Sequence, residues 1–551
     1  MGLYSAPRWI ARTTITRRTL LKGALAGAAS AGLRVTPSSA SQSSMDDRML
    51  GLRDIEEATI AELQAAMEDR RLTSRILVRT YLRRIEQLDP QLKSIIEVNP
   101  DALDIARELD RERREHGPRG PLHGIPILLK DNIDTADKMS TTAGSLALVG
   151  AKPPADSTVA RKLREAGAIL IGKANMSEWA NFRGFQSSSG WSARGGQGRN
   201  PYALDRNPCG SSSGSAQAVS ANLVTAALGT ETDGSIVCPS SICGIVGIKP
   251  TVGLVSRTGV IPIAHSQDTV GPMCRTVADA AAVLGAIVGP DPEDPATAES
   301  VGRFFTDYTQ FLDSDGLRGA RIGVARQVYF GYSPEADRII EQAIQAMRDL
   351  GAEIIDPADI PTAQEIATFE AELEVLLYEF RHDIDAYLAR LVESPVRTLE
   401  DLIAFNEAHA DEELRYFGQE LFLLAQQKGP LTDEAYLNAL EKNRRLGRQD
   451  GIDAVMDQYQ LDAIVAPTGS PAWKIDLING DHFLGASSSP AAIAGYPLVT
   501  VPAGYAFGLP VGITFMGRAY SEPTLIRLAY AFEQATKVRK PPELLPTIDA
   551  E

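Results

Sequence analysis

Two glycine-flanked turns rich in hydroxyl side chains lie close together in the chain, between Cys209 and Pro239. The first reads Cys-Gly-Ser-Ser-Ser-Gly-Ser over residues 209–215, and the second reads Gly-Thr-Glu-Thr-Asp-Gly-Ser-Ile over residues 229–236. Glycine lets the backbone approach a ligand closely, so main-chain N–H groups in such turns can converge on negative charge. The apolar residues 216–228 between them predict one packed helix, which a flexible linker would not contain. The stretch therefore predicts a pair of candidate catalytic loops.

The balance of charged residues excludes some classes of partner. The 551 residues include 71 Asp and Glu against 55 Lys and Arg, a formal net charge of -16. A protein this acidic repels nucleic acid and anionic lipid, because both carry negative charge. We therefore expect neither a nucleic-acid partner nor a membrane partner, while the charge leaves the substrate and the oligomeric state open.

The N-terminal region departs from this acidic character. Residues 1–40 contain six basic residues and no acidic one, and Arg17-Arg18 precedes a weakly apolar run at residues 23–33. Twin arginines before such a run, followed by the small residues Ser38-Ser39-Ala40, are typical of a bacterial twin-arginine export signal. The run is too short to span a bilayer. We expect residues 1–40 to be removed and the mature protein to be periplasmic or secreted.

Cysteine and histidine show no metal-binding pattern. The six histidines are scattered, with neither a His-x-x-x-His pair nor a Cys-x-x-Cys motif in the sequence, so we expect no metal site. An even number of cysteines permits disulfides without requiring them. Cys209 and Cys238 border the two turns, and we expect both to be small buried packing residues.

Short apolar runs alternate with helical patterns along most of the chain. Residues 125–129 predict a buried strand, and Ser333-Pro334 is typical of the start of a helix, expected over residues 335–350. Further strands are expected at residues 168–171, 246–248, 322–324, 464–465, 498–501 and 512–515. This alternation predicts an α/β protein, a single large domain over residues 50–545 with a mixed β-sheet covered by helices on both faces.

Two helical regions interrupt the alternation. Residues 52–116 contain the capping-box pattern of Thr59 to Glu62 and a second cap at Thr73, followed by an apolar stripe at helical spacing. Residues 363–450 form a long charged block, for which we expect helices over residues 365–391, 398–427 and 433–459. We interpret the first region as packing and assign no chemistry to it.

A serine nucleophile needs a base that takes its proton. Gly210 to Gly214 matches the Gly-x-Ser-x-Gly elbow, but that elbow follows an apolar strand, whereas residues 200–208 are polar and contain prolines. Of the histidines downstream, His265 follows a proline-bounded loop, and His382 and His409 lie in the charged block. A histidine-activated elbow is therefore disfavoured.

A neutral lysine is the other base that the sequence offers. At an ordinary pKa near 10.4, roughly one lysine in 2,500 is neutral at pH 7, and burial that lowers the pKa by about three units costs roughly 4 kcal/mol. Lys130 ends the buried strand predicted at residues 125–129, while Lys173 and Lys249 also follow short apolar runs. A second serine could relay the proton from nucleophile to lysine, and the two turns supply both serines.

Several further motifs accompany these turns, and together they resemble the amidase signature family over roughly residues 54–538. The resemblance rests on Gly124-Ile125-Pro126, Lys130-Asp131-Asn132, Gly172 to Glu178, Cys209 to Ser215, Gly229 to Pro239, Gly247 to Thr251, Gln267 to Met273, Ala466-Pro467-Thr468, Pro497 to Pro502 and Gly508 to Gly512.

The resemblance implies a role for each residue of a Ser-Ser-Lys triad. Lys130 would be the general base, Ser211 the bridging serine in a cis peptide, and Ser235 the nucleophile. The backbone N–H groups of Thr232, Asp233, Gly234 and Ser235 would form the oxyanion hole, and no cofactor is implied.

Asp233 departs from the two glycines that many relatives carry before the nucleophile. Together with Trp179 to Gly184 and Gly190 to Gly196, it makes the chain most similar to the bacterial peptide amidase branch, whose members release ammonia from C-terminal peptide amides. The resemblance thus implies hydrolysis of a peptide or small-molecule amide through an acyl-enzyme.

Other readings of the same family remain. An amidotransferase component that feeds ammonia to glutamate-charged transfer RNA would work in the cytoplasm with partners, which the export signal and the acidic charge disfavour. Hydrolases of small, aryl or fatty acid amides share the same motifs. A non-catalytic extracytoplasmic binding protein is disfavoured because all three triad residues are present.

Overall fold

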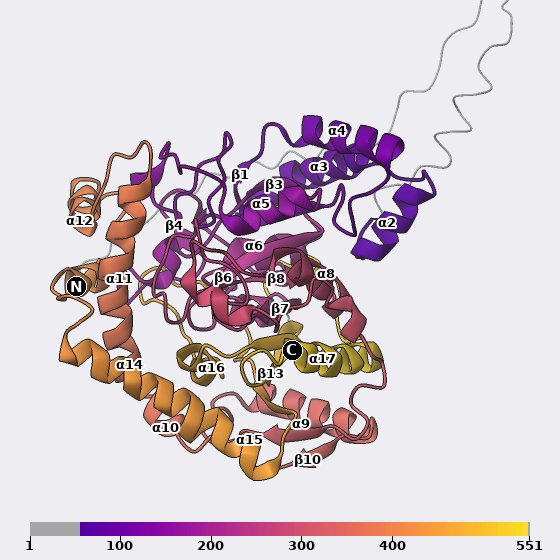
Figure 1. Ribbon diagram of the computed structural model, residues 1–551, viewed down its shortest axis with the longest axis vertical. Coiled ribbons are helices and arrows are strands. Elements are labelled where there is room, and N and C mark those ends of the chain that lie inside the picture. Colours follow the sequence, from indigo (N-terminus) through magenta and orange to yellow (C-terminus); the bar gives the residue numbers. More distant parts are fainter. Residues whose placement is uncertain (1–54, 549–551) are drawn as a thin grey trace, which may run out of the picture. The chain divides into compact units, whose positions relative to one another are not determined.

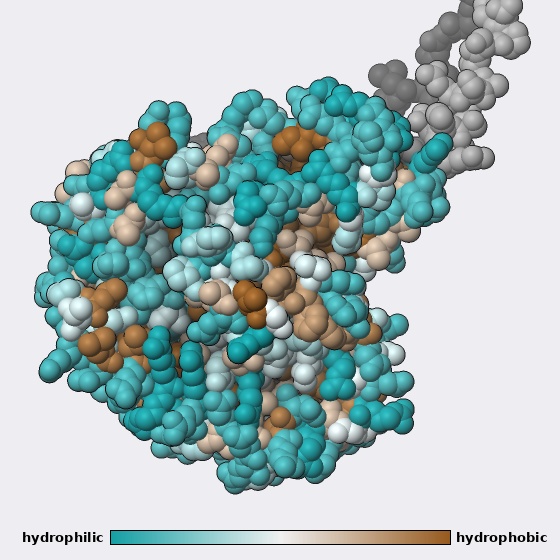
Figure 2. All heavy atoms as spheres, in the orientation of Figure 1, coloured by the Kyte–Doolittle hydropathy of each residue, from teal (hydrophilic) through white to brown (hydrophobic). Residues whose placement is uncertain are grey.

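The structure, a computed structural model, describes residues 55–548, which belong to one compact unit, Met49–Glu551. The expected export signal, residues 1–40, lies outside the described residues. Among those described, no helix is both long and apolar enough to cross a lipid bilayer. The face shown in Figure 2 is mostly hydrophilic and carries scattered hydrophobic patches.

An eleven-stranded sheet runs through the protein (Figure 1). Its strands, in spatial order, are β1 (Ile95–Val98), β3 (Ile169–Ala174), β2 (Pro126–Lys130), β6 (Ala226–Glu231), β8 (Thr269–Cys274), β7 (Val246–Lys249), β12 (Leu498–Ala506), β13 (Leu509–Met516), β11 (Ala463–Pro467), β9 (Arg321–Val324) and β10 (Glu353–Ile355). β2 pairs in parallel with β3 and β6, whereas β8 pairs in antiparallel with β6 and β7. The predicted mixed α/β sheet is therefore confirmed. β4 (Trp191–Ser192) and β5 (Gly196–Gln197) form a separate small sheet.

Helices flank this sheet because its central strands are apolar and fully buried. They are α2 (Ile60–Glu68), α3 (Ser74–Leu92), α4 (Ala102–His116), α5 (Thr158–Glu165), α6 (Ser213–Ser220), α7 (Val237–Ile242), α8 (Val277–Ile287), α9 (Pro334–Asp349), α16 (Ser489–Ala494) and α17 (Glu522–Thr536). Figure 1 shows α3 and α4 near the β1 edge and α9 near β10, the opposite edge.

The helix starts follow their local sequence signals. Thr59 and Glu62 form the predicted capping box, and the Thr73 hydroxyl accepts a hydrogen bond from the N–H of Ile76. The Ser333 hydroxyl likewise caps α9, with Pro334 in its first turn. These starts were predictable because side-chain caps satisfy the first N–H groups of a helix locally.

The single helix expected over residues 216–228 is wrong. α6 ends at Ser220, Asn222 takes a left-handed conformation with φ of 56°, and β6 begins at Ala226. The Asn222 side chain accepts a hydrogen bond from the N–H of Glu57 at 2.9 Å, so a distant segment stabilises the turn. The apolar run is therefore split between a helix and a central strand, a choice that periodicity alone cannot make.

The charged block is helical, as predicted, but more divided. Its helices are α10 (Ala363–Ile366), α11 (Glu370–Arg390), α12 (Leu399–Ala408), α13 (Glu420–Gln426), α14 (Glu434–Gly447) and α15 (Asp453–Tyr459), with a π-helical turn at Arg448–Ile452. α11 packs through Phe380, whose ring centroid lies 5.2 Å from that of Phe182 and 5.1 Å from that of Phe422. The block is thus attached to the segment just before the two serine turns.

Candidate active site

Lys130 is the last residue of β2, and its amine lies among hydroxyl groups. β2 is buried along its whole length between β3 and β6, so the side chain at its end does not reach solvent. Lys130 Nζ lies 2.7 Å from Ser211 Oγ, 2.8 Å from Thr230 Oγ1 and 3.2 Å from the Thr230 carbonyl oxygen. Thr230 belongs to the neighbouring strand β6, so the parallel pairing of β2 with β6 builds this contact.

Burial lowers the pKa of Lys130 to about 7, although the charges of Asp268 and Glu231 act in the opposite direction. A charged amine in this position would lose its hydration and gain only polar, uncharged hydrogen-bond partners. Lowering the pKa towards 7 makes the neutral amine common near neutral pH, and a neutral amine can accept a proton.

The other two buried lysines do not contact either serine turn through their amines. Lys173 Nζ donates to the carbonyl oxygen of Ile133 at 2.6 Å and to Thr141 Oγ1 at 2.7 Å. Lys249 Nζ donates to the carbonyl oxygen of Tyr496 at 2.7 Å. Of the three lysines that the sequence leaves open as bases, only Lys130 contacts a serine hydroxyl.

Ser211 sits in a tight turn immediately before α6. The Gly210–Ser211 peptide bond is cis, and the Ser211 carbonyl accepts a hydrogen bond from the N–H of Ser177 at 3.1 Å. A Cβ atom on residue 210 would lie 2.0 Å from Ser177 Oγ, so only glycine fits there. The turn is therefore packed against the segment that follows β3.

Ser235 follows β6 in the turn of residues 232–235, directly before α7. Glu231 Oε2 accepts the N–H groups of Ile236 at 2.7 Å and Val237 at 3.0 Å, so this carboxylate fixes the start of α7. The Ser212 N–H donates to the Ser235 carbonyl at 3.1 Å, which joins the two serine turns. Lys130, Ser211 and Ser235 thus come from three segments that meet at one place.

The backbone N–H groups of Thr232, Asp233, Gly234 and Ser235 donate no hydrogen bond to any acceptor within residues 55–548. Backbone N–H groups need an acceptor, so four consecutive ones without a protein acceptor are available to a ligand oxygen. Gly234 has a φ of 77°, a conformation that glycine adopts without strain. All four residues predicted for the oxyanion hole therefore lie in one loop with available donors.

The Asp233 carboxylate contacts the start of α16. It accepts hydrogen bonds from Ser488 Oγ at 2.5 Å and Ser489 Oγ at 2.6 Å. Burial raises the pKa of Asp233, and burial also raises the pKa of its neighbour Glu372 on α11 well above the ordinary value. The Asp233 carboxylate thus anchors the loop of residues 232–235.

Asp268 is a residue of this site to which the sequence assigned no role. Its Oδ1 accepts the Thr232 hydroxyl at 2.5 Å, and its Oδ2 accepts the N–H groups of Ile263 at 2.8 Å and Ala264 at 3.0 Å. Burial raises its pKa to about 6. The sequence places Asp268 in one of the family motifs, Gln267 to Met273, but a motif does not reveal which residue its carboxylate contacts in space.

Cys209 and Cys238 are buried in a small apolar cluster, as expected. The sequence leaves their pairing open, and in the structure they form a disulfide between the two serine turns, with their Cα atoms 6.2 Å apart. Cys243 and Cys274 are buried free thiols. The sequence alone did not reveal the pairing, because the pairing depends on β6 returning the chain to the first turn. The sequence suggested a single helix over residues 216–228 instead.

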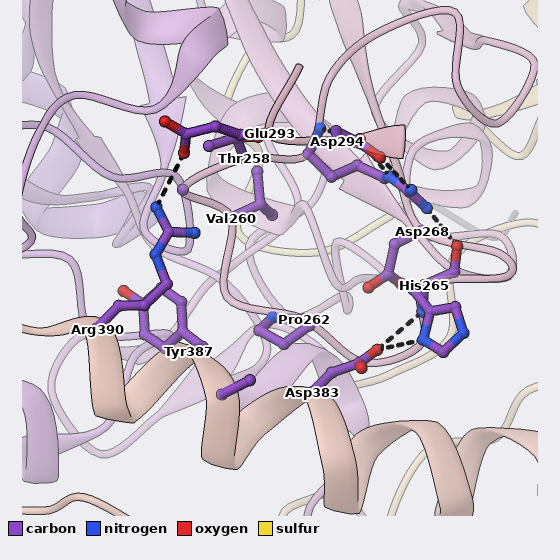
Figure 3. Close-up of a pocket in the computed structure, with 13 residues that line it drawn as sticks. Thr258, Val260, Pro262, His265, Asp268, Glu293, Asp294, Asp383, Tyr387 and Arg390 are labelled. Carbon is purple, nitrogen blue, oxygen red and sulfur yellow. Dashed lines mark hydrogen bonds and ion pairs between the residues drawn. The ribbon is translucent and has the colours of Figure 1, made fainter. Parts of the chain in front are cut away.

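A pocket of about 260 Å³ lies beside this site (Figure 3). Asp383, Tyr387 and Arg390 of α11 line one side, and the chain around Asp268 lines the other. Asp268 also lines a small cavity of about 10 Å³, together with Thr230 and Thr232. The Lys130, Ser211 and Ser235 side chains do not line the larger pocket, so Asp268 stands between it and the hydroxyl groups around Lys130.

His265, Glu379 and Asp383 bring their polar atoms within 4.8 Å of one another at this pocket. His265 Nδ1 lies 2.7 Å from Asp383 Oδ2, and its Nε2 lies 3.5 Å from Glu379 Oε1. Burial acts to lower the pKa of His265, but the hydrogen bond to Asp383 and the charge of Glu379 raise it overall. Both ring nitrogens therefore face carboxylates, which is the arrangement of an ion pair with a protonated histidine.

Comparison with known proteins identifies the family. The family model described as Amidase matches residues 76–526. A probable amidase of Arabidopsis thaliana is 47% identical over 506 residues, covering 90% of this chain and 94% of that protein. The native peptide amidase of Stenotrophomonas maltophilia superposes with a TM-score of 0.84 at 54% identity, covering 89% of this chain and 99% of that one.

A glutamyl-tRNA(Gln) amidotransferase component of Geobacter metallireducens is also similar, at 38% identity over 494 residues, which cover 87% of this chain and 97% of that protein. These matches extend over nearly the whole described structure, including the strands and turns that carry Lys130, Ser211 and Ser235. The chain therefore belongs to the amidase signature family and is an amidohydrolase.

Proposed function

We propose that this amidase hydrolyses carboxylic amides to acid and ammonia through a Ser235–Ser211–Lys130 triad. The observation that carries the proposal is the contact of 2.7 Å between the buried Lys130 amine and Ser211 Oγ. A lysine with a pKa of about 7 is matched to proton transfer near neutral pH. Ser211 belongs to the turn that is hydrogen-bonded to the turn of Ser235.

In the proposed first step, Ser235 Oγ attacks the amide carbonyl carbon. The Ser235 proton passes to Ser211 Oγ while the Ser211 proton passes to Lys130 Nζ, so the relay ends with a charged lysine and a tetrahedral intermediate. The same relay then returns the proton to the amide nitrogen, and ammonia leaves an acyl-enzyme. Water repeats the cycle on the acyl group and releases the acid.

The negative charge on the tetrahedral oxygen would be held by the N–H groups of residues 232–235. A donor of this kind is worth about 2.7–4 kcal/mol in comparable sites. The donors are fixed before substrate arrives, because Glu231 holds the start of α7 and the Asp233 carboxylate is held by Ser488 and Ser489. Little reorganisation would then accompany the reaction.

We further propose C-terminal peptide amides as the substrates. The support is the likeness to a peptide amidase at 54% identity across almost its full length. The test is ammonia release from a panel of C-terminally amidated peptides, free carboxylic amides, aryl amides and glutamine. A preference for amidated peptides is expected; activity confined to small or aryl amides would overturn the substrate assignment and leave the triad untouched.

The amidotransferase components found in the comparison suggest a second candidate, a glutaminase that supplies ammonia to a partner. Glutamine hydrolysis that appears only when partner proteins are added would favour it.

We also propose export by the twin-arginine route. The proposal is supported by the motif at Arg17-Arg18 and by the disulfide, a bond typical of proteins in oxidising compartments. Cell fractionation of an R17K/R18K variant tests this, since cytoplasmic retention of the variant is expected.

A further inference from the structure

The disulfide between Cys209 and Cys238 joins the two turns that carry the proposed triad serines. Cys209 lies two residues before Ser211, and Cys238 lies three residues after Ser235. We propose that this disulfide positions Ser211 and Ser235 for catalysis, and that its reduction lowers turnover without unfolding the protein. The proposal rests on the proposed function, because it needs both serines to be catalytic.

Each turn is ordered locally by its own hydrogen bonds. The Cys209 N–H donates to Asn207 Oδ1 at 2.8 Å, and the Cys209 carbonyl accepts the Ser213 hydroxyl at 2.8 Å. The Cys238 N–H donates to the Gly234 carbonyl at 2.8 Å. None of these bonds depends on the disulfide, so both turns keep their internal shape when it is broken.

Hydrogen bonds through Ser212 and Lys130 also join the two turns. The Ser212 N–H donates to the Ser235 carbonyl at 3.1 Å, and Ser212 Oγ donates to the Thr230 carbonyl at 3.0 Å and accepts the Thr230 N–H at 3.2 Å. Lys130 Nζ contacts both Ser211 Oγ and Thr230 Oγ1. The disulfide is the covalent link between them, and the two cysteines are 29 residues apart. Its loss therefore acts on the spacing of the serines, to which proton relays are sensitive.

The cysteines are packed in a small apolar cluster rather than in the main core. Tyr202, Ile242 and Trp473 are members of this cluster with Cys209 and Cys238. Because the main core of the sheet is separate, breaking the disulfide leaves the packing of β2, β6 and β8 intact. A loss of activity and a loss of the fold can therefore be separated experimentally.

Cys274 provides the matched control. It is buried at the end of β8 and has no disulfide partner, and burial raises the pKa of its thiol well above the ordinary value. A Cys274→Ala substitution removes a buried sulfur of the same kind without touching either turn. This variant shows how much activity and stability change when a buried cysteine outside the two turns is removed.

Reduction is a two-electron exchange. A dithiol such as dithiothreitol transfers two electrons and two protons to the S–S bond, which yields two protein thiols and the cyclic disulfide of the reagent. Alkylation after denaturation, followed by mass spectrometry, counts the thiols, and two additional alkylated cysteines are expected on reduction. The comparison of oxidised and reduced wild-type protein keeps every side chain in place.

The experiment measures kcat, KM, melting temperature and the rate of fluorophosphonate labelling for four forms: the oxidised protein, the reduced protein, C209A/C238A and C274A. We expect kcat and the labelling rate to fall at least tenfold in the reduced protein and in C209A/C238A, with KM changed less than threefold. C274A should stay within twofold of the oxidised protein. Melting temperatures should remain well above the assay temperature.

Turnover within twofold of the oxidised protein, in C209A/C238A or after complete reduction, would overturn the proposal. If the dithiol does not reduce the native disulfide, the turnover of C209A/C238A tests the proposal. If C209A/C238A does not fold, the turnover of the reduced wild-type protein tests it. Ser235→Ala, assayed in parallel, separates the two claims. An active S235A would refute the proposed function, whereas an inactive S235A with a fully active reduced enzyme would refute only the role of the disulfide.

Discussion

Lys130 Nζ and Ser211 Oγ lie 2.7 Å apart although 81 residues separate them in the chain, and both side chains are fully buried. Lys130 arrives on a strand and Ser211 on the turn before a helix, so neither can move without disturbing the sheet or α6. This fixed geometry suits the proposed role of Lys130 as general base, because the amine is held within hydrogen-bonding distance of the hydroxyl and its burial lowers its pKa.

The first prediction concerns the pH dependence of the reaction. Because burial lowers the pKa of Lys130 to about 7, the neutral base predominates above pH 7 and disappears below it. The value of kcat/KM should therefore fall about tenfold per pH unit on the acidic side of 7. A profile that stays flat between about pH 5.5 and 8 would contradict this role, as would turnover near the wild-type level in Lys130→Met.

The second prediction separates the serines. Ser235→Ala removes the nucleophile and should lower kcat at least ~10⁴-fold, whereas Ser211→Ala interrupts only the relay and should cost ~10²–10⁴-fold. Ser220→Ala is the matched control: its buried hydroxyl donates to the Cys243 carbonyl at 2.6 Å, away from Lys130. That variant should lose about 1 kcal/mol of unfolding free energy and keep its turnover. Equal turnover in S235A and S220A would refute the assignment.

The third prediction tests Asp268 as a positioning residue. Its charge raises the pKa of Lys130, so Asp268→Asn should lower that pKa and move the acidic limb of the rate profile to lower pH, by ~0.5–1 unit. The amide oxygen can still accept two hydrogen bonds, but the amide NH₂ group cannot accept the third that the carboxylate accepts. A purely structural role for Asp268 would lower stability and leave the position of the limb unchanged.

The fourth prediction concerns a buried ion cluster that attaches the charged block. Arg183 forms an ion pair with Glu178 and lies 3.6 Å from Glu413, and all three side chains are inaccessible to solvent. Arg183→Met would leave two buried carboxylates without their cation, which should cost ~3–5 kcal/mol in denaturant unfolding.

Arg71, paired with Asp69 at the surface, is the matched control for that substitution. Its side chain is 44% exposed, and Arg71→Met should change the unfolding free energy by less than ~1 kcal/mol. Comparable losses of unfolding free energy in both variants would show that the buried Arg183 cluster stabilises the protein no more than a surface ion pair does.

Local sequence predicted much of this protein. The apolar run that ends in Lys130 indicated a buried strand with an amine at its end, because the run is short and is bounded by glycine and proline. Thr59, Thr73 and Ser333 begin helices because a cap acts within a few residues. Gly210 and Gly234 likewise indicate tight turns from their own identity. Each of these signals acts between neighbours in the chain.

Several relations that complete the site appear only in three dimensions. Three features depend on β6 lying between β2 and β8. They are the split of residues 216–228 into α6 and β6, the disulfide between Cys209 and Cys238, and the contact of Asp268 with Thr232. Strand order is decided by which apolar faces pack best across the whole sheet, a sum over distant residues that local periodicity does not contain. The sequence by itself determined which side chains are candidates for the chemistry, and the tertiary structure decided which of them meet.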